Sequence, residues 1–221
     1  MAHSPLTVGS GDHHVLALHG WFGSARGWGS LPDYLDGSAF TYVFMDLRGY
    51  GDRQQAGGEF TMASHQVLLQ APDRVRKLVG INPVPATSVP MDEQGWALFS
   101  GAAAQAGNRA AIIDFTTGNK LTKTFIDQVV RHSLDHSSVG AYLRSWAKDD
   151  FSSSLKPDHG TPVKVIVGET DPALSAAVME QTWLAFFPGA ELTVLANAGH
   201  YPMFETPVAL ATCIEEFLGR E

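Results

Sequence analysis

Short, continuous apolar runs, each followed by a polar or glycine-rich turn, constrain this chain more than any other feature of its sequence. Runs of this length, rich in β-branched and aromatic residues, are typical of strands that are buried on both faces of a sheet. A sheet of such strands needs a covering layer on each side. The runs are residues 14–18, 41–45, 75–81, 163–167 and 192–195.

Helical patterns accompany these runs at residues 63–70, 176–187 and 207–218. Ala-Pro follows the first pattern and Pro-Gly the second, as expected where a helix ends. Alternation of strand and helix predicts an α/β fold with a mainly parallel sheet flanked by helices. Ligands of such a fold bind beyond the carboxyl ends of the strands, so functional residues are expected directly after them.

Residues 83–157 interrupt this alternation and read as several helices with aromatic residues among polar ones. A loop-rich segment, residues 156–162, then leads back to the next strand. We therefore predict one core, built from residues 1–82 and 158–221, with residues 83–157 inserted as a helical cap. The aromatic residues of the insertion are Trp96, Phe99, Phe115, Phe125, Tyr142 and Trp146.

Charge and cysteine content restrict the partners and the compartment. The chain has 15 basic and 23 acidic residues and thus a net charge of −8. This negative charge would repel nucleic acid or an anionic membrane surface. No stretch approaches the roughly 20 apolar residues that span a bilayer, and the amino terminus has no pattern of a secretory signal. With Cys213 as the only cysteine, an internal disulfide is excluded, and a cytoplasmic protein that binds neither nucleic acid nor membrane is expected.

Four segments occur in a fixed order along the chain: VLALHGWFGSARGW, FMDLRGYGDR, VIVGETDPAL and NAGHYPMFETP. Together they resemble the His-Gly loop, the Asp-x-Arg-Gly-x-Gly turn, the acid-bearing strand end and the catalytic-histidine loop of the α/β-hydrolase superfamily. APDRVRKLVGINP resembles the strand after the nucleophile helix of that superfamily, so the likeness covers almost the whole chain. The resemblance implies an α/β-hydrolase fold with a helical cap, similar to esterases and cofactor-free haloperoxidases.

His200 and Asp171 are the catalytic residues that the resemblance implies. His200 lies in the loop after the last predicted strand, where a neutral imidazole could accept a hydroxyl proton near neutral pH. Asp171 follows the preceding strand and would hold the imidazole tautomer. The alternatives are a histidine that caps the next helix, an aspartate that forms a helix N-cap, and Glu169 as the acid in place of Asp171.

The loop after His19 is the candidate oxyanion site, because a glycine-rich turn after a strand can present backbone N–H groups. By resemblance, Gly20 and Trp21 form this site, with the N–H of Trp21 as one donor. The alternative is an ordinary tight turn in which Gly20 and Gly23 have positive φ. His19 itself is predicted to be a buried structural residue with backbone hydrogen bonds.

Other polar clusters are interpreted as structural. Asp46 and Arg48 are expected to form a turn with a possible ion pair. Histidines at positions 13, 14 and 19, and at 132 and 136, have spacings that metal sites can use, but the arrangement lacks the acidic residues of a motif such as H-E-x-x-H. Neither a metal nor a cofactor is therefore expected.

The nucleophile that this superfamily requires is missing from the sequence. No G-x-S-x-G motif occurs, and only 19 residues, positions 52–70, separate Gly51 from Ala71. A helix, a buried strand, the turn that carries the nucleophile and a second helix need about 50 residues, since a crossover alone takes at least about 10 to 12. Ser64 and Ser24 lack the flanking glycines of such a turn and are weak substitutes.

Two structural outcomes are compatible with this shortage. The strand at residues 75–81 could cross over from the strand at 41–45 into the vacated central place, which would keep the sheet continuous. Alternatively, a further segment of chain fills that place. An unfilled gap would leave a row of backbone groups without hydrogen-bond partners in the interior.

The leading functional hypothesis is a hydrolase of small, partly apolar ester or acyl substrates. It would use a nucleophile, His200 and Asp171 in a two-step covalent mechanism. The alternative from another class is a catalytically inactive, hydrolase-like domain that binds a small ligand or a protein under its cap. A product that folds poorly is the third possibility.

Overall fold

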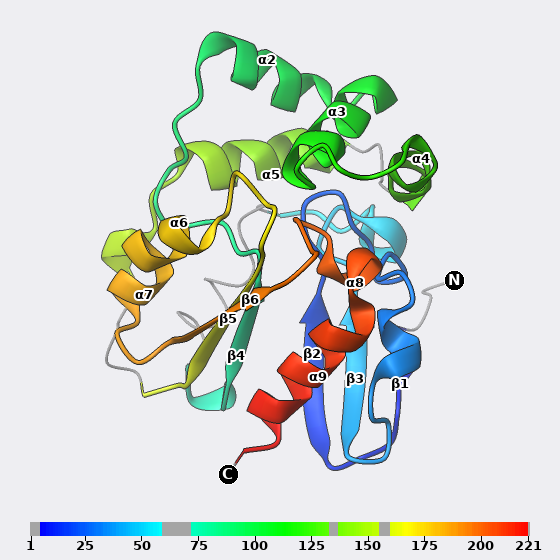
Figure 1. Ribbon diagram of the computed structural model, residues 1–221, viewed down its shortest axis with the longest axis vertical. Coiled ribbons are helices and arrows are strands. Elements are labelled where there is room, and N and C mark those ends of the chain that lie inside the picture. Colours follow the sequence, from blue (N-terminus) through cyan, green and yellow to red (C-terminus); the bar gives the residue numbers. More distant parts are fainter. Residues whose placement is uncertain (1–4, 59–71, 133–136, 155–159, 221) are drawn as a thin grey trace.

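The computed structural model of the protein describes residues 5–58, 72–132, 137–154 and 160–220. Strands form the lower part of the molecule in Figure 1, and the helices of the central part of the chain lie above them. Two predicted features, the helix at residues 63–70 and Ser64, lie outside the described residues.

The first sheet contains β1 (Leu6–Val8), β2 (His13–Leu18) and β3 (Phe40–Met45), in the order β1-β3-β2. Strands β2 and β3 are parallel, with Val15 opposite Tyr42, whereas β1 pairs with β3 in the antiparallel sense. The two parallel strands confirm the predicted runs. Strand β1 was not predicted because its three residues are too few to show a period.

The second sheet contains β4 (Leu78–Ile81), β5 (Val163–Gly168) and β6 (Glu191–Leu195), all parallel and in that order. Every residue of β5 is buried, as predicted for a continuous apolar run. The same prediction is wrong for β2 and β6, where the side chains of Leu16 and Val194 are 50% and 47% exposed.

Of the two outcomes left open by the sequence, a continuous sheet that includes β4 does not form among the described residues. Strand β4 stays beside β5, and its ladder extends at both ends, from Leu78 N–H to Pro162 O and from Asn82 N–H to Ile166 O. Strand β4 is the edge strand of the second sheet, and its other edge pairs with no described strand. Within the described part of the chain, the two sheets therefore remain separate ladders.

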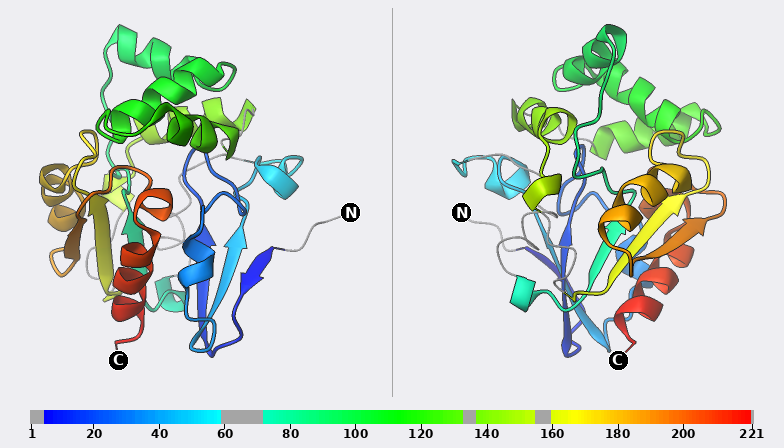
Figure 2. Two further views of the ribbon diagram at one scale, coloured as in Figure 1. Left: turned by 45° about the vertical axis from the view of Figure 1, so that its right-hand side comes forward. Right: turned by 90° about the vertical axis from the view of Figure 1, so that its left-hand side faces the viewer.

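The helices α2 (Glu93–Gly101), α3 (Ala106–Thr116), α4 (Lys123–His132) and α5 (Ser137–Lys148) all come from the segment predicted as a cap. They stay together above the strands in all three views (Figures 1 and 2). Short 3-10 turns lie elsewhere: η1 (Leu31–Tyr34), η2 (Gly51–Arg53), η3 (Pro72–Arg74) and η4 (Ser152–Ser154). No helix among the described residues is long and apolar enough to cross a membrane.

The C-terminal third supplies the remaining helices. The pattern at residues 176–187 forms two pieces, α6 (Ala176–Gln181) and α7 (Trp183–Phe186), and the pattern at 207–218 forms α9 (Pro207–Leu218). The short helix α8 (Pro202–Glu205) precedes α9 and was not predicted.

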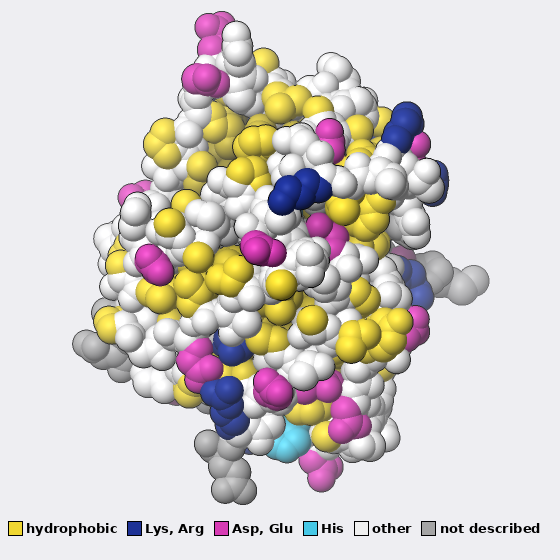
Figure 3. Space-filling view, in the orientation of Figure 1, with side chains coloured by type: hydrophobic (Ala, Val, Ile, Leu, Met, Phe, Trp, Pro, Cys, Tyr) yellow, Lys and Arg dark blue, Asp and Glu magenta, His cyan; other side chains and the backbone are white. Residues whose placement is uncertain are grey.

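One apolar cluster connects the two sheets. It combines side chains of β3, β5, β6 and α9, and α9 lies against the strands in Figure 1. The partly buried Cys213 packs against this cluster, in agreement with its predicted core position. The face seen in Figure 3 carries scattered acidic side chains, in line with the net charge of −8.

Candidate active site

His200 and Asp171 lie in contact at one edge of the second sheet. Asp171 is in the loop after β5, and His200 is in the loop between β6 and α8. Because β5 and β6 are parallel neighbours, their carboxyl ends bring the two loops together. The distance between His200 Nδ1 and Asp171 Oδ2 is 2.7 Å.

Asp171 is held in place on both of its carboxylate oxygens. Its Oδ1 accepts hydrogen bonds from the backbone N–H groups of Ala173 and Leu174, at 2.9 and 3.1 Å. Burial alone raises the pKa of Asp171, which is 2% exposed, but hydrogen bonds from His200 and the backbone outweigh it, so the pKa lies below its ordinary value. The alternative of a helix N-cap is wrong, because Ser175 occupies that position of α6.

One ring nitrogen of His200 faces Asp171, and the other has no hydrogen-bond partner among the residues that the structure describes. Since Nδ1 faces a carboxylate, we assign its proton there, which leaves the lone pair on Nε2. In the described part of the chain Nε2 makes no hydrogen bond, and the side chain is 29% exposed. The side chain of His200 caps no helix, because α8 begins after Tyr201 without a side-chain cap.

Glu205 clamps the backbone on both sides of His200, a role that the sequence did not indicate. Its Oε1 accepts from Gly199 N–H and its Oε2 from Tyr201 N–H, each at 2.9 Å. Burial raises the pKa of Glu205, although these two N–H groups favour the ionised form. The N–H of His200 itself donates to Thr116 O at 3.1 Å, so three consecutive backbone donors of this loop are satisfied.

The loop around His200 also packs tightly against the end of helix α3. A Cβ atom at Gly199 would lie 2.7 Å from Thr117 Cα and 2.9 Å from Thr116 O. Any larger residue at position 199 would therefore push the loop away from α3. The helix of the cap segment and the histidine loop thus form one packed unit.

Asn82 is the second residue that the sequence analysis missed. It directly follows β4, has a φ of 42°, and is buried. Its Nδ2 donates to Asp171 Oδ2 at 2.8 Å, on the same oxygen that faces His200. Its own Oδ1 is buried without a hydrogen-bond partner in the described structure. Its place directly after a strand is the signal that could have identified it.

The loop after β2 contains the tight turn that was considered as the alternative, because Gly23 N–H donates to Gly20 O at 2.9 Å. The positive φ expected at Gly20 and Gly23 is wrong, since neither residue has it. Gly20 is exposed, with open space where a side chain would lie. Among the described residues the backbone N–H of Trp21 takes part in no hydrogen bond. Trp21 and Tyr201, the neighbour of His200, pack against the same apolar cluster.

His19 is structural, as predicted. It is 5% exposed; its Nε2 accepts from Leu47 N–H at 3.0 Å, and its Nδ1 lies 2.8 Å from Gly20 O. Burial lowers the pKa of His19. Because both ring nitrogens are engaged, neither is available to a metal ion.

The turn after β3 is also structural. The oxygens of Asp46 accept from the backbone N–H groups of Ala25 and Asp52, at 2.7 and 3.0 Å. The possible ion pair with Arg48 does not form between these described residues.

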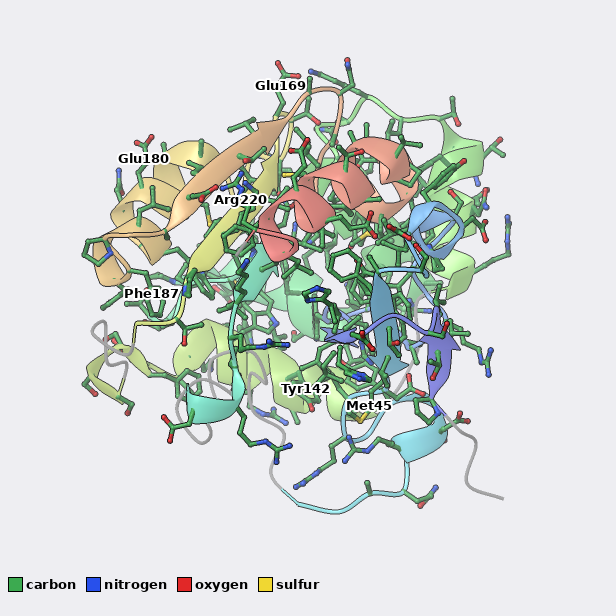
Figure 4. The ribbon with its side chains drawn as sticks, turned by 90° about the horizontal axis from the view of Figure 1, so that it is seen from below. Met45, Tyr142, Glu169, Glu180, Phe187 and Arg220 are labelled. Carbon is green, nitrogen blue, oxygen red and sulfur yellow. The ribbon has the colours of Figure 1, made fainter. Side chains whose placement is uncertain are left out.

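Glu169, the competing acid, lies away from His200. It is exposed, its Oε2 accepts from Asn197 N–H at 3.1 Å, and it lies at the rim of the molecule in Figure 4. Ser24, considered as a substitute nucleophile, makes no hydrogen bond to His200. Of the histidines considered for a metal site, His13 packs on Phe40, and position 136 lies outside the described residues.

Comparison with solved structures places the fold. A hydrolase from Oleispira antarctica superposes with a TM-score of 0.80 at 15% identity, covering 98% of this chain and 94% of that one. An esterase from Exiguobacterium antarcticum gives a TM-score of 0.79 at 16% identity, covering 97% and 94%. A bromoperoxidase from Bacillus anthracis gives 0.73 at 16% identity, covering 97% and 94%. At these identities the likeness concerns the fold.

Sequence comparison points the same way. A 70-residue segment is 40% identical to the pimeloyl-[acyl-carrier protein] methyl ester esterase of Klebsiella pneumoniae, covering 30% of this chain and 26% of that protein. The corresponding protein of Citrobacter koseri is 41% identical over 71 residues, or 27% of its length. The match thus spans about a quarter of these relatives. A sequence profile described as the alpha/beta hydrolase family matches residues 55–212, well over half of the chain, and the chain therefore belongs to that family.

Proposed function

We propose that this protein hydrolyses small, partly apolar esters or related acyl compounds, with His200 as general base and Asp171 as the carboxylate that orients it. The observation that carries the proposal is the pair itself: Nδ1 of His200 is bound to a buried carboxylate, Nε2 makes no hydrogen bond with a described residue, and the side chain is partly exposed. An imidazole held in this tautomer can accept a proton at Nε2 and return it.

The reaction would proceed in two balanced steps. The hydroxyl oxygen of the nucleophile, a residue that the sequence analysis did not identify, attacks the acyl carbon. Its proton passes to Nε2 of His200, while the electron pair of the carbonyl double bond moves to the carbonyl oxygen. The N–H of Trp21, beside Gly20, is proposed to stabilise that oxyanion. His200 then gives the proton to the leaving alcohol as its bond to the acyl carbon breaks, and water releases the acyl group by the same sequence.

The chemistry of the substrate follows from the helices of residues 83–157, which we propose to act as the cap. Their inner side contributes buried apolar residues such as Ile112, Ile113 and Val129 to the cluster on which Trp21 and Tyr201 pack. A substrate between the cap and the base would therefore meet apolar side chains on one side. The esterase activity of the Klebsiella relative is consistent with an acyl substrate.

Hydrolysis of p-nitrophenyl acetate and butyrate, measured with purified wild-type protein and His200→Ala, tests this proposal. We expect kcat/KM to fall by about 10³-fold or more, because the base is lost. The matched control is His14→Ala, which removes an exposed histidine of β2 and should leave turnover unchanged. Wild-type turnover in His200→Ala would refute the assignment of the base.

A second candidate is an inactive, hydrolase-like binding domain, favoured by the finding that no hydroxyl side chain among the described residues bonds to His200. Intact-mass analysis after treatment with a fluorophosphonate separates the two candidates. One stoichiometric adduct together with ester turnover supports the hydrolase. An unmodified mass of 23.8 kDa without turnover supports the binding domain.

A further inference from the structure

Trp21 connects the loop after β2 with a helix of the cap. Its indole N–H donates to Val139 O in α5 at 2.7 Å, across 118 residues of sequence. Its backbone carbonyl accepts from the hydroxyl of Tyr50 at 2.7 Å. One residue thus carries the proposed oxyanion donor on its backbone and a long-range anchor on its side chain.

The indole is also fixed by ring contacts. It stacks on Phe22 with ring centres 4.2 Å apart, lies parallel to Phe99 at 5.8 Å, and meets Trp146 edge-on at 5.4 Å. An aromatic ring held on several sides has few alternative rotamers. The indole of Trp21 is therefore held by its neighbour Phe22 and by two rings of the cap helices, Phe99 in α2 and Trp146 in α5.

Helix α5 is tied to the neighbouring loop as well. Ser138 Oγ donates to Gly49 O at 2.7 Å, and Tyr142 OH donates to Arg48 O at 3.2 Å. Since Tyr50 of the same loop bonds to Trp21, the contacts form a closed circuit from Trp21 through α5 and the loop after β3 back to Trp21. Such a circuit resists rotation of any one member.

The peptide group that carries the N–H of Trp21 is held at its other end too. Its carbonyl oxygen, Gly20 O, accepts from Gly23 N–H at 2.9 Å and lies 2.8 Å from His19 Nδ1. The exposed Gly20 has no side chain to support this peptide group. Its plane is therefore fixed by the carbonyl hydrogen bonds on one side and by Trp21 on the other.

We propose that the indole of Trp21 is a positioning group, which uses its bond to Val139 O in α5 to fix the direction of its own backbone N–H toward the reacting oxygen. This inference rests on the proposed hydrolase function. Donors contribute to catalysis through being fixed before charge develops on the substrate oxygen. Helix α5 is then part of the catalytic apparatus in addition to covering the substrate.

The test compares Trp21→Phe with Trp28→Phe. Both changes keep an aromatic ring, but the indole N–H of Trp28 is buried without a partner in the described structure, and its ring packs on Phe44 of β3, so its loss breaks no hydrogen bond. For Trp21→Phe we expect kcat to fall by about 10-fold, less than for loss of a whole oxyanion donor, with KM within about twofold. For Trp28→Phe both constants should stay within about twofold.

Binding of an alkyl phosphonate monoester provides a readout that does not need turnover. This tetrahedral anion resembles the charged intermediate, whereas the matching neutral ketone resembles the substrate. Trp21→Phe should weaken binding of the phosphonate by about 10-fold and leave binding of the ketone unchanged. Equal losses for both ligands, or equal behaviour of the two tryptophan variants, would overturn the proposal.

Should Trp21→Phe not fold, as judged by its thermal melt, Tyr50→Phe removes the hydroxyl that bonds to Trp21 O and is expected to act in the same direction. Unchanged phosphonate binding in that variant would then count against the proposal. The proposed function fails separately, through wild-type turnover by His200→Ala, and the comparison of phosphonate with ketone is independent of that outcome.

Discussion

The substitution Glu205→Gln probes how the loop of His200 is held. The carboxylate accepts two backbone N–H groups, one on each side of His200, both at 2.9 Å. Glutamine has the same shape, but only one of its terminal atoms is an acceptor. The other, an NH₂ group, would face a backbone N–H, so one donor must lose its partner or the loop must shift.

The size of the effect follows from these two contacts. A buried N–H without an acceptor costs about 1 to 3 kcal/mol. Loss of the carboxylate offsets part of this cost, because burial raises the pKa of Glu205 and so disfavours its ionised form. We therefore expect a net loss of about 1 to 2 kcal/mol in the free energy of unfolding, or roughly 2 to 8 °C in Tm for a chain of this size. A displacement of the imidazole by up to about 1 Å would lower kcat by about 10- to 100-fold.

Urea unfolding and ester hydrolysis, measured on the same preparations, separate stability from positioning. The matched control is Glu215→Ala in α9, because Glu215 Oε1 accepts two hydrogen bonds, from Asp36 N–H at 2.7 Å and from Tyr42 OH at 2.9 Å, and both donors lose their acceptor in that variant. That control should lose a similar amount of stability and keep its kcat.

The proposed role of Glu205 in holding the His200 loop would be refuted if Glu205→Gln retained the kcat of the wild type. It would also be refuted if Glu215→Ala lost activity to the same extent, since the loss would then follow stability alone. A pH series adds a signed check. Because the pKa of Glu205 is raised, its contribution to stability is complete below its ordinary value of 4.5 and is lost as the pH rises through the raised value. This loss should be missing in Glu205→Gln.

Three further predictions follow from the site. Asp171→Asn should lower kcat by about 10³-fold or more, because the amide NH₂ facing Nδ1 of His200 forces the proton onto Nε2; it should also abolish the part of acid unfolding that sets in below the ordinary pKa of 3.8. Burial lowers the pKa of His19, so stability in urea should decline as the pH falls below 6.5, and His19→Gln should lack this decline. Asn82→Gly, which keeps the positive φ accessible, should cost about 1 to 2 kcal/mol in urea unfolding by removing a donor to Asp171; an unchanged midpoint would contradict that role.

The resemblance to the α/β-hydrolase superfamily singled out Asp171 and His200, and the predicted strands before them indicated where both residues would lie. Parallel pairing then determines which loops meet, and that rule needs no knowledge of side-chain packing. Asn82 follows a strand as well and could have been predicted on the same ground. Glu205 could not, since its contacts depend on the bend of the chain between His200 and α8.

Other features depended on contacts between distant segments. The bond from His200 N–H to Thr116 O joins the histidine loop to a helix 84 positions earlier, a separation that no local pattern reveals. Whether the sheet is continuous could not be predicted either, because the pairing of a strand depends on contacts between distant segments. Among the described residues, β4 pairs with β5 alone, and the first sheet remains a separate ladder.

Helix α9 shows what keeps two separate ladders in one folded body. Its residues Leu210 and Ile214 lie in the same cluster as side chains of both sheets. Hydrogen bonds extend from it in both directions, from Tyr42 OH to Glu215 and from Lys77 Nζ to Phe217 O. Helix α9 therefore covers apolar surface of both sheets, and opening either sheet would expose apolar surface of the other. We expect the two separate backbone ladders to unfold together in one cooperative transition.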